Sequence, residues 1–190
     1  MVDKLSAGGA RVADVGCGHG ASTIMMATAF PASTFHGTDA HAASVQTARD
    51  RANAAAPDLP VTFDVTGADG MRGGPYDLIT MFDCLHDMGD PIGAARRVRE
   101  VIADDGTWMI VEPAAGDHVE DNFNPIGRAY YGFSTLLCTP VVVGPAGRIG
   151  AGHAGRSGAD PRCGDRRRFH PVPARGPDPP VQQRFFEVRP

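Results

Sequence analysis

Short apolar runs alternate with helix-like segments along the first 113 residues of the chain. The apolar runs have the length of strands and cover residues 11–16, 34–39, 61–65, 77–83 and 107–112. The segments typical of helices cover residues 21–30, 43–55 and 94–102. Because apolar strands separated by helices form parallel sheets covered on both faces, the pattern predicts an α/β fold, a doubly wound Rossmann-like sheet with five recognisable strands.

The pattern changes after the fifth predicted strand. One more helix is predicted over 124–138, with Pro125 near its start and aromatic residues on one side. Beyond Pro140 neither the helical nor the strand period is visible, and about half of residues 141–184 are Gly, Pro or Arg. We therefore expect a folded core over 1–140 and a poorly ordered tail over 141–190.

The two parts also differ in charge. Residues 1–140 carry 9 Lys and Arg against 18 Asp and Glu, a net charge of −9, whereas residues 141–190 carry 9 against 4, a net of +5. An acidic core argues against a nucleic-acid surface there, and binding through Arg166–Arg168 stays an alternative for the tail.

Cysteine spacing and hydropathy argue against a zinc-binding, disulfide-bonded, membrane-spanning or secreted protein. Cys17, Cys84, Cys138 and Cys163 form no Cys-x-x-Cys pair, so we interpret them as reduced thiols and expect neither a zinc site nor a disulfide framework. No apolar run approaches the roughly 20 residues of a membrane helix, and the N-terminus does not resemble a signal peptide. A soluble cytoplasmic protein is the expectation.

A glycine-rich turn follows the first predicted strand. In the segment Asp14–Gly20, Gly16, Gly18 and Gly20 stand at alternate positions, so that a ligand can approach the backbone without meeting a Cβ atom. Dinucleotide-binding turns have the spacing G-x-G-x-x-G, which places a pyrophosphate on the helix N-terminus. The G-x-G-x-G spacing therefore predicts a ligand without pyrophosphate and disfavours the alternative of a nicotinamide-dependent oxidoreductase.

Two acidic residues accompany this turn. Asp39 closes the second strand, where its carboxylate can accept hydrogen bonds from both hydroxyls of a ribose. Asp14 either faces a cationic amino group or fixes the loop through its amides. Both roles suit a nucleoside that carries an amino acid.

These segments together resemble the successive motifs of class I S-adenosylmethionine-dependent methyltransferases. The motifs are Asp14–Gly20, Asp39, Asp83–Asp87 and Gly106–Glu112. The resemblance is closest to actinobacterial-type methyltransferases that carry a winged-helix domain ahead of the segment where this chain begins. It implies S-adenosyl-L-methionine as cofactor, contacted by Asp14, Gly16, Gly18, Gly20, Asp39, Ala68, Asp69 and Asp83, although an acid usually occupies the position of Ala68.

The resemblance also suggests a catalytic residue. His86-Asp87 is similar to the His-Asp pair of winged-helix O-methyltransferases that act on small molecules, in which the histidine removes the proton of the acceptor hydroxyl. The alternative is that His86 caps the strand end or contacts the methionine part of the cofactor. Glu112, at the end of the fifth strand, either faces the acceptor or has a structural role, and no metal is required for this displacement.

Three aromatic residues and one histidine have weaker assignments. Tyr130, Tyr131 and Phe133 either line an acceptor pocket or belong to the core. His19 is expected only to complete the glycine turn.

The tail suggests a shifted reading frame. Codons that fit Arg168–Pro173 and Val181–Arg184, when read one base later, encode Gly-Phe-Thr-Arg-Phe and Phe-Asn-Asn-Val, which resemble the end of the family's sequence. We hypothesise a frameshift near Pro140 that is restored near Phe185; a genuine disordered basic tail is the alternative. With the terminal strands missing, we expect the fifth strand to be an unpaired edge and a dimer to form only in a full-length relative. The leading hypothesis is methyl transfer to a small-molecule acceptor, and the alternative is an inactive cofactor-binding remnant; a stable active enzyme is not expected from this chain alone.

Overall fold

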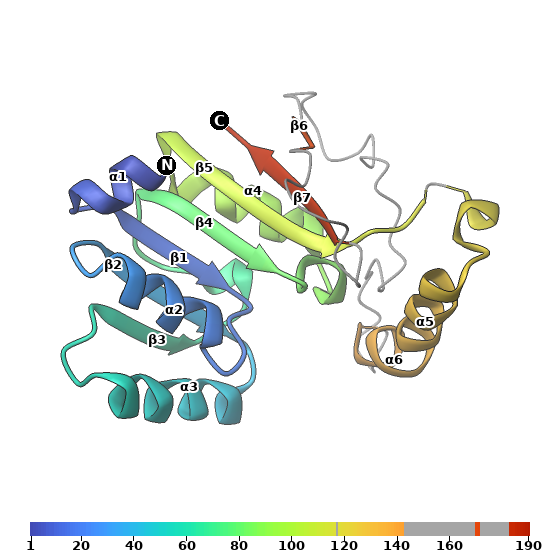
Figure 1. Ribbon diagram of the computed structural model, residues 1–190, viewed down its shortest axis with the longest axis horizontal. Helices are drawn as coiled ribbons and strands as arrows, with labels where there is room; N and C mark the ends of the chain where they lie inside the picture. The colour runs from blue at the N-terminus through green and yellow to red at the C-terminus, as the bar shows by residue number, and fades with distance from the viewer. Residues whose placement is uncertain (117, 143–169, 172–182) are drawn as a thin grey trace.

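A sheet of seven strands forms the centre of the computed structural model, which describes residues 1–116, 118–142, 170–171 and 183–190 (Figure 1). The strand order is β3-β2-β1-β4-β5-β7-β6. The strands are β1 (Arg11–Val15), β2 (Thr34–Asp39), β3 (Val61–Val65), β4 (Tyr76–Phe82), β5 (Ile102–Pro113), β6 (His170–Pro171) and β7 (Gln183–Val188). The first five are parallel, with the chain order reversing beside β1, so the predicted doubly wound class is confirmed.

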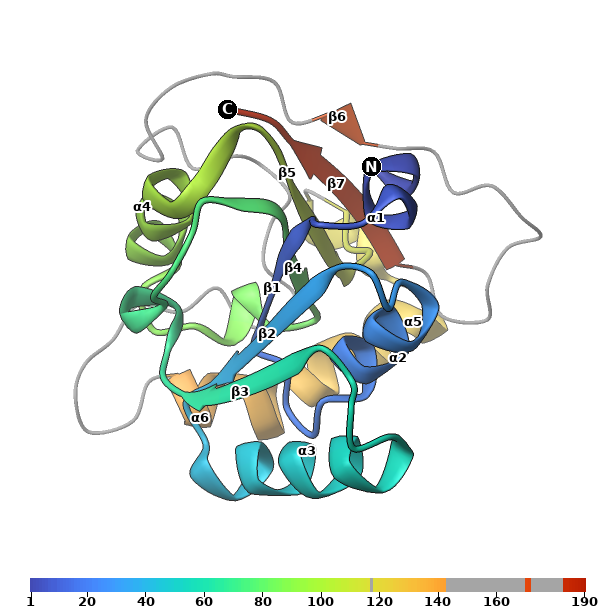
Figure 2. The same cartoon turned by 90° about the vertical axis from the view of Figure 1, so that its left-hand side faces the viewer.

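Helices cover both faces of the sheet. The helices of the core are α1 (Val2–Ala7), α2 (Ala21–Ala29), α3 (Ala42–Ala55) and α4 (Pro91–Val101). Figure 2 shows α4 on one side of the sheet and α1 and α2 on the other. The alternation within β1 explains this: Val12 packs with Ala27 of α2, whereas Ala13 packs with Val98 of α4.

The start of α4 shows how local chemistry moves a predicted boundary. The apolar period indicates a helix from Ala94, but the helix begins three residues earlier at Pro91. Asp90 precedes it as N-cap, and its Oδ1 accepts a hydrogen bond of 2.8 Å from the amide of Gly93. Pro91 occupies the first helical position, where no amide hydrogen is needed.

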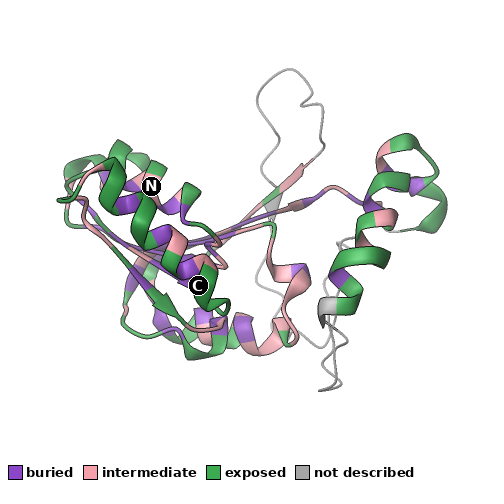
Figure 3. Cartoon of the chain, turned by 90° about the horizontal axis from the view of Figure 1, so that it is seen from below, coloured by how far each residue is buried: buried purple, intermediate pink, exposed green. Residues whose placement is uncertain are grey.

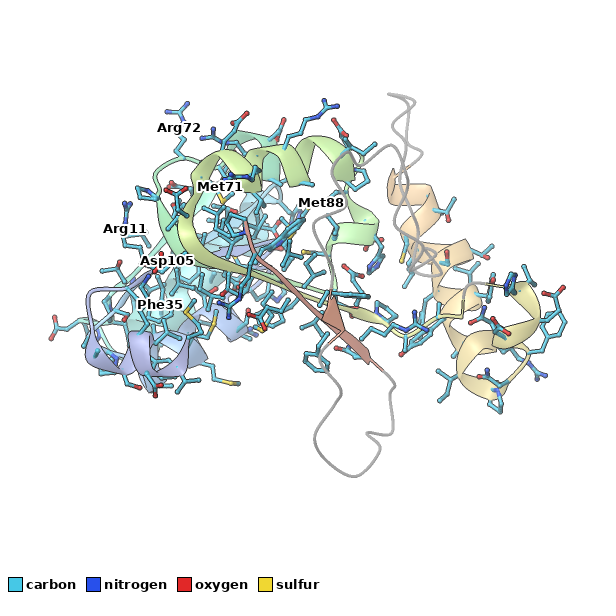
Figure 4. All side chains as sticks on the ribbon, turned by 90° about the horizontal axis from the view of Figure 1, so that it is seen from above. Arg11, Phe35, Met71, Arg72, Met88 and Asp105 are labelled. Atoms are coloured by element: carbon cyan, nitrogen blue, oxygen red, sulfur yellow. The ribbon has the colours of Figure 1, made fainter. Side chains whose placement is uncertain are left out.

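Charged side chains join the amino-terminal ends of the strands to α1. The ammonium group of Lys4 lies 2.5 Å from Asp77 Oδ1 and 3.1 Å from Asp105 Oδ2. The amide of Arg11 donates to Asp77 Oδ2 over 2.8 Å. Arg11 and Asp105 lie at the same end of the molecule in Figure 4, far from α5. The opposite end of the sheet, where the parallel strands finish, is therefore the one available for a ligand.

The strand β7 corrects one expectation. We expected β5 to be an unpaired edge, but β7 pairs with it in antiparallel register from Trp108–Val188 to Pro113–Gln183. Phe186 and Val188 pack against the core cluster on the α4 side. The final residues thus cover the apolar edge of β5.

A helical extension leaves the sheet after β5. It comprises α5 (Pro125–Phe133), a π-helical turn η4 (Ser134–Cys138) and α6 (Thr139–Val142), which together confirm the predicted helix. A short 3₁₀ turn, η3 (Val119–Asn122), precedes them. Figure 1 shows α5 and α6 beyond the carboxyl ends of the parallel strands, and Figure 3 shows that most of their residues are exposed.

Some expectations for the tail fall on residues that the structure does not describe. Most of the segment for which we hypothesise a frameshift, together with Cys163 and Arg166–Arg168, lies in 143–169 and 172–182, outside the described residues. In the part of the chain that is described, none of the helices combines the length and apolar character needed to cross a bilayer.

The pairing of β7 predicts a stability difference between two neighbouring phenylalanines. Phe186 packs on the core, whereas Phe185 is 40% exposed and belongs to none of the core clusters. Phe186→Ala should lower the free energy of unfolding by about 1–2 kcal/mol, less than the roughly 3–5 kcal/mol of a fully buried phenylalanine. Phe185→Ala is the matched control and should cost less. Urea denaturation measures both, and equal losses would contradict the packing of β7.

Candidate active site

The glycine-rich turn between β1 and α2 depends on glycine at three positions. Gly16, Gly18 and Gly20 have φ angles of 72°, 52° and 75°, in the left-handed region that L side chains rarely adopt. Around Gly16 and Gly20 the space is also filled: an added Cβ would lie 2.7 Å from Cys84 Sγ and 2.8 Å from Ala48 Cβ, respectively. At Gly18 nothing lies within 4 Å of an added Cβ. Of the three glycines, Gly18 is thus the one with open space beside its Cα atom.

Hydrogen bonds tie this turn to the end of β2. The amides of Gly16 and Cys17 donate to the carbonyl of Thr38 over 2.8 and 3.0 Å. The amide of Gly18 donates to Asp39 Oδ2 over 2.9 Å, and the amide of His41 donates to Asp39 Oδ1 over 2.8 Å. Each carboxylate oxygen has a second lone pair, so Asp39 can still accept hydrogen bonds from a bound sugar.

Asp14, in β1 just before the turn, forms hydrogen bonds to α2 and β4. Its side chain is 1% exposed; Oδ2 accepts hydrogen bonds of 2.6 Å from the hydroxyls of Ser22 and Thr23, and Oδ1 accepts one of 2.8 Å from Thr80. Burial raises the pKa of Asp14, and the three hydroxyl donors oppose that rise. Of the two roles that we predicted, the structure favours fixing the loop, through hydroxyls rather than amides.

The end of β4 lies against the same turn. Cys84 fills the space beneath Gly16, and its thiol donates to the carbonyl of Val15 over 3.1 Å. Asp83, beside it, is exposed and has a φ of 57°, the one left-handed angle of a residue other than glycine among the described residues. The carboxyl end of β4 is thereby fixed beside the open part of the turn.

His86 and Glu112 form a hydrogen-bonded pair at this rim. His86 lies in the short 3₁₀ turn η2 (Leu85–Asp87) after β4, and Glu112 lies near the end of β5. One oxygen of Glu112 contacts His86 Nδ1, and the other accepts a hydrogen bond of 2.9 Å from the amide of Leu85. Of the two alternatives for Glu112, the structure favours the structural one, because its carboxylate lies at Nδ1 and orients the histidine.

The charges around His86 determine its proton affinity. Burial lowers the pKa of His86, but the hydrogen bond and charge of Glu112, followed by the charges of Asp87 and Asp83, raise it by more. The net result is a histidine whose pKa lies above its ordinary value. Such a group takes up a proton readily near neutral pH.

A second set of groups surrounds the other ring nitrogen of His86. Asp87 Oδ1 lies 3.3 Å from Nε2, and Cys138 Sγ, from the π-helical turn η4, lies 4.0 Å from it. Sequence reasoning missed this contact, because His86 and Cys138 are 52 residues apart and have no motif spacing. Two groups of side chains can hold a metal ion: His86, Asp87 and Cys138, or Asp83, His86 and Glu112.

The three aromatic residues of α5 differ in their burial. Tyr130 is buried, and burial together with the charge of Asp83 raises the pKa of its hydroxyl. Tyr131 and Phe133 are 39% and 51% exposed. His19 and Asp69 are also exposed, and no contact in the described part of the chain links either of them to the site. The Oδ1 atom of Asp69 accepts a hydrogen bond from the amide of Gly70.

Ala68 is placed differently from an acid that contacts a base. Its side chain is buried in the core cluster beside Met71, in a short 3₁₀ turn, η1 (Ala68–Gly70). Only its backbone remains for contact with a nucleobase, so the predicted adenine contacts of Ala68 and Asp69 stay predictions.

The fold and the turn define the class of the protein. A parallel sheet with the chain reversal at β1, a glycine turn open at Gly18 and an acid at the end of β2 are the features of a Rossmann-like domain that binds a nucleoside. The profile of the methyltransferase domain family matches residues 13–108. The chain belongs to this family, whose class I members use S-adenosylmethionine as methyl donor.

Solved structures of similar fold agree with this assignment. A protein from Nostoc punctiforme described as a candidate O-methyltransferase has 19% identity and a TM-score of 0.67 over 94% of this chain and 51% of its own. The YcgJ protein of Bacillus subtilis has 25% identity and a TM-score of 0.53 over 65% and 55%. The [4+2]-cyclase SpnF has 25% identity and a TM-score of 0.54 over 58% and 40%. A search of curated protein sequences found no match.

These matches cover only part of each similar structure. The chain spans between two fifths and about half of the length of most of them, and one of them is named as a cyclase. The matches establish the fold and the family, whereas the reaction depends on the residues of the site.

The geometry of the turn predicts different costs at two glycines. Gly20→Ala adds a clash with Ala48 to an unfavourable φ, whereas Gly18→Ala adds only the unfavourable φ. The angle costs about 1–2 kcal/mol, and the overpacking adds about 1–3 kcal/mol. Gly20→Ala should therefore lower the urea midpoint of unfolding by more than Gly18→Ala. Equal midpoints for the two variants would contradict the packing of Gly20.

Proposed function

We propose that this chain binds S-adenosylmethionine at the turn from Asp14 to Gly20 and transfers its methyl group to a hydroxyl of a small molecule. The observation that carries the proposal is the pair of His86 and Glu112 at the rim of that turn. The domain comprises residues 1–140, to whose sheet β7 adds a strand, and the protein acts in the cytoplasm, in keeping with the reduced thiols of Cys17 and Cys84.

The residues around the turn fit this cofactor. Asp39 would accept the ribose hydroxyls, and the open backbone at Gly18 would lie against the nucleoside. Asp14 would act indirectly, because its oxygens already accept three hydroxyl hydrogen bonds. When bound, the cofactor supplies a methyl group on a positively charged sulfur, which a nucleophile attacks in line.

The exposed acid at the end of β4 completes the binding side. Asp83 is held by its left-handed backbone beside Cys84, which itself lies under Gly16. An anionic side chain at this place suits a ligand that carries a cationic amino group and a sulfonium. Asp83 would therefore face the charged part of the cofactor.

His86 would act as the general base. Its Nε2 would accept the proton of the acceptor hydroxyl as the oxygen attacks the methyl carbon. Glu112 would keep the ring oriented through Nδ1 and stabilise the imidazolium that results. The elevated pKa of His86 means that the neutral, basic form increases as the pH rises through that value.

The acceptor would enter beside α5. Tyr130 is the one aromatic residue of that helix that is buried and that lies within the influence of Asp83. The exposed face of α5 contains Tyr131 and Phe133, so these two would not line the pocket in this chain. The chemistry of the site fits a small phenol or alcohol.

Transfer of a labelled methyl group tests the function. The full chain is incubated with S-adenosylmethionine labelled in its methyl group and a panel of small phenols and alcohols. His86→Ala should lower the transfer rate about 10²–10⁴-fold, because a positioned base contributes that much. Its affinity for S-adenosylhomocysteine, measured by calorimetry, should stay unchanged.

Two results would contradict the proposal. Binding of S-adenosylhomocysteine without transfer to any acceptor would identify the chain as an inactive cofactor-binding remnant. Transfer at the full rate by His86→Ala would exclude this residue as the base. Asp58→Asn, an exposed position before β3, serves as a control that should change neither quantity.

The carboxylate of Glu112 predicts a pH dependence. Since its hydrogen bond and charge raise the pKa of His86, Glu112→Gln should move the titration of His86 to lower pH. In the unmutated chain the pair stabilises the fold fully below the unfolded pKa of histidine, and this contribution is lost as the pH rises through the higher folded pKa. NMR of the imidazole Cε1–H signal measures the pKa in both chains. An unchanged or higher pKa in the variant would contradict the pairing.

A further inference from the structure

We propose that His86, Asp87 and Cys138 form a binding site for a thiophilic divalent cation such as Zn²⁺. The three groups come from two separate elements, η2 after β4 and η4 after α5, and each offers one ligand atom. These atoms all lie within 4.8 Å of one another. The spacing of the cysteines along the sequence suggests no zinc site, because the ligands meet only in the fold.

The two distances from His86 Nε2 to the other ligand atoms are close to those around a tetrahedral zinc ion. Zinc binds imidazole nitrogen, carboxylate oxygen and thiolate sulfur at about 2.0, 2.1 and 2.3 Å, which puts nitrogen about 3.4 Å from oxygen and about 3.6 Å from sulfur. In the structure His86 Nε2 lies 3.3 Å from Asp87 Oδ1 and 4.0 Å from Cys138 Sγ. A movement of η4 toward η2 by a few tenths of an ångström would bring the sulfur to the nitrogen–sulfur distance of a zinc site.

The side chain of Asp87 gives an independent indication of a cation. The side chain is 38% exposed, but its Oδ1 is buried and accepts no hydrogen bond from a described residue, although His86 Nε2 lies at the distance of an ion pair. A buried carboxylate oxygen without a donor is costly. A metal ion between Asp87, His86 and Cys138 would satisfy it.

The other side of His86 has the arrangement that metal-binding histidines require. A histidine that binds metal through one ring nitrogen usually donates the hydrogen of the other to a carboxylate or a carbonyl. Glu112 provides this carboxylate at Nδ1, so that the lone pair of Nε2 faces Asp87 and Cys138. Two cation-binding side chains and one oriented imidazole, with a fourth position left for water, match the open type of zinc site.

Binding of the ion would remove His86 from its role as a base. The Cys138 thiol loses its proton to solvent, sulfur and nitrogen each donate a lone pair to the ion, and no oxidation or reduction occurs. The Nε2 lone pair is then no longer available to a hydroxyl. This consequence rests on the proposed function, whereas binding of the metal does not.

Titration of the full chain with Co²⁺, followed by displacement with Zn²⁺, tests the site. Co²⁺ bound to a thiolate gives a near-ultraviolet charge-transfer band, which a site of oxygen and nitrogen alone does not. We expect this band in the unmutated chain and its loss on addition of Zn²⁺. Cys138→Ser should abolish the band, and Glu112→Gln should weaken Zn²⁺ binding about 10–100-fold.

Matched variants distinguish this site from metal binding elsewhere on the chain. Cys163→Ser, outside the described residues, should keep the band, and Asp87→Asn should weaken binding of Zn²⁺ in a chain whose circular dichroism is unchanged. Absence of the band, its survival in Cys138→Ser, or Co²⁺ binding without it through Asp83, His86 and Glu112 would each overturn the proposal. Binding of S-adenosylhomocysteine is measured in the same samples. Its loss would contradict the proposed function, whatever the result for the metal site.

Discussion

The buried carboxylate of Asp14 fixes the turn on which the site depends. Transfer of a carboxylate from water into a protein interior is costly, and three hydroxyl donors offset this cost. Because these donors belong to α2 and β4, Asp14 in β1 joins the three elements at the point where the chain order reverses. The glycine turn follows Asp14 directly in the chain. The hydrogen bonds of Asp14 therefore fix β1, α2 and β4 around the glycines that adopt left-handed φ angles.

The two halves of the site are connected through close packing rather than through one motif. Cys84 fills the space under Gly16, which leaves no room for a side chain there and brings the end of β4 to the turn. The next residues along the chain lead to His86, whose orientation Glu112 sets from β5. A change in the position of β5 would therefore reach the histidine through the hydrogen bond of Glu112. Because β7 pairs with β5, it can influence the site although it does not contribute a residue to it.

The periodicity of apolar residues along the sequence predicted those strands and helices whose formation depends on nearby residues. The five parallel strands and the first three crossover helices follow from apolar runs and their spacing, and β2 and β3 have the predicted bounds. The strand β7 was missed as a partner of β5, because its pairing joins residues about 75 positions apart across a segment without periodicity. The short helix α1 was missed because six residues are too few for a helical period.

The residues of the site also divide into those that the sequence predicts and those that only the packing of the elements reveals. The glycines and Asp39 were predictable, because the turn and the acid that follows it about twenty residues later have a fixed spacing in nucleoside-binding folds. The contact between Glu112 and His86, and the approach of Cys138 to the same ring, depend on how β4, β5 and η4 pack, and residue spacing contains no such information. Family resemblance identified the histidine, and only the structure showed what orients it.

We propose that the turn from Asp14 to Gly20, together with Asp39, binds a nucleoside cofactor without pyrophosphate. Amide chemical shifts of the labelled chain, recorded by NMR during titration with S-adenosylhomocysteine and in parallel with NAD, test it most directly. S-adenosylhomocysteine should shift the amide signals of Gly16, Gly18 and Gly20 and of residues next to Asp39, while NAD should leave them in place. Shifts confined to other parts of the chain, or equal effects of the two ligands, would contradict it.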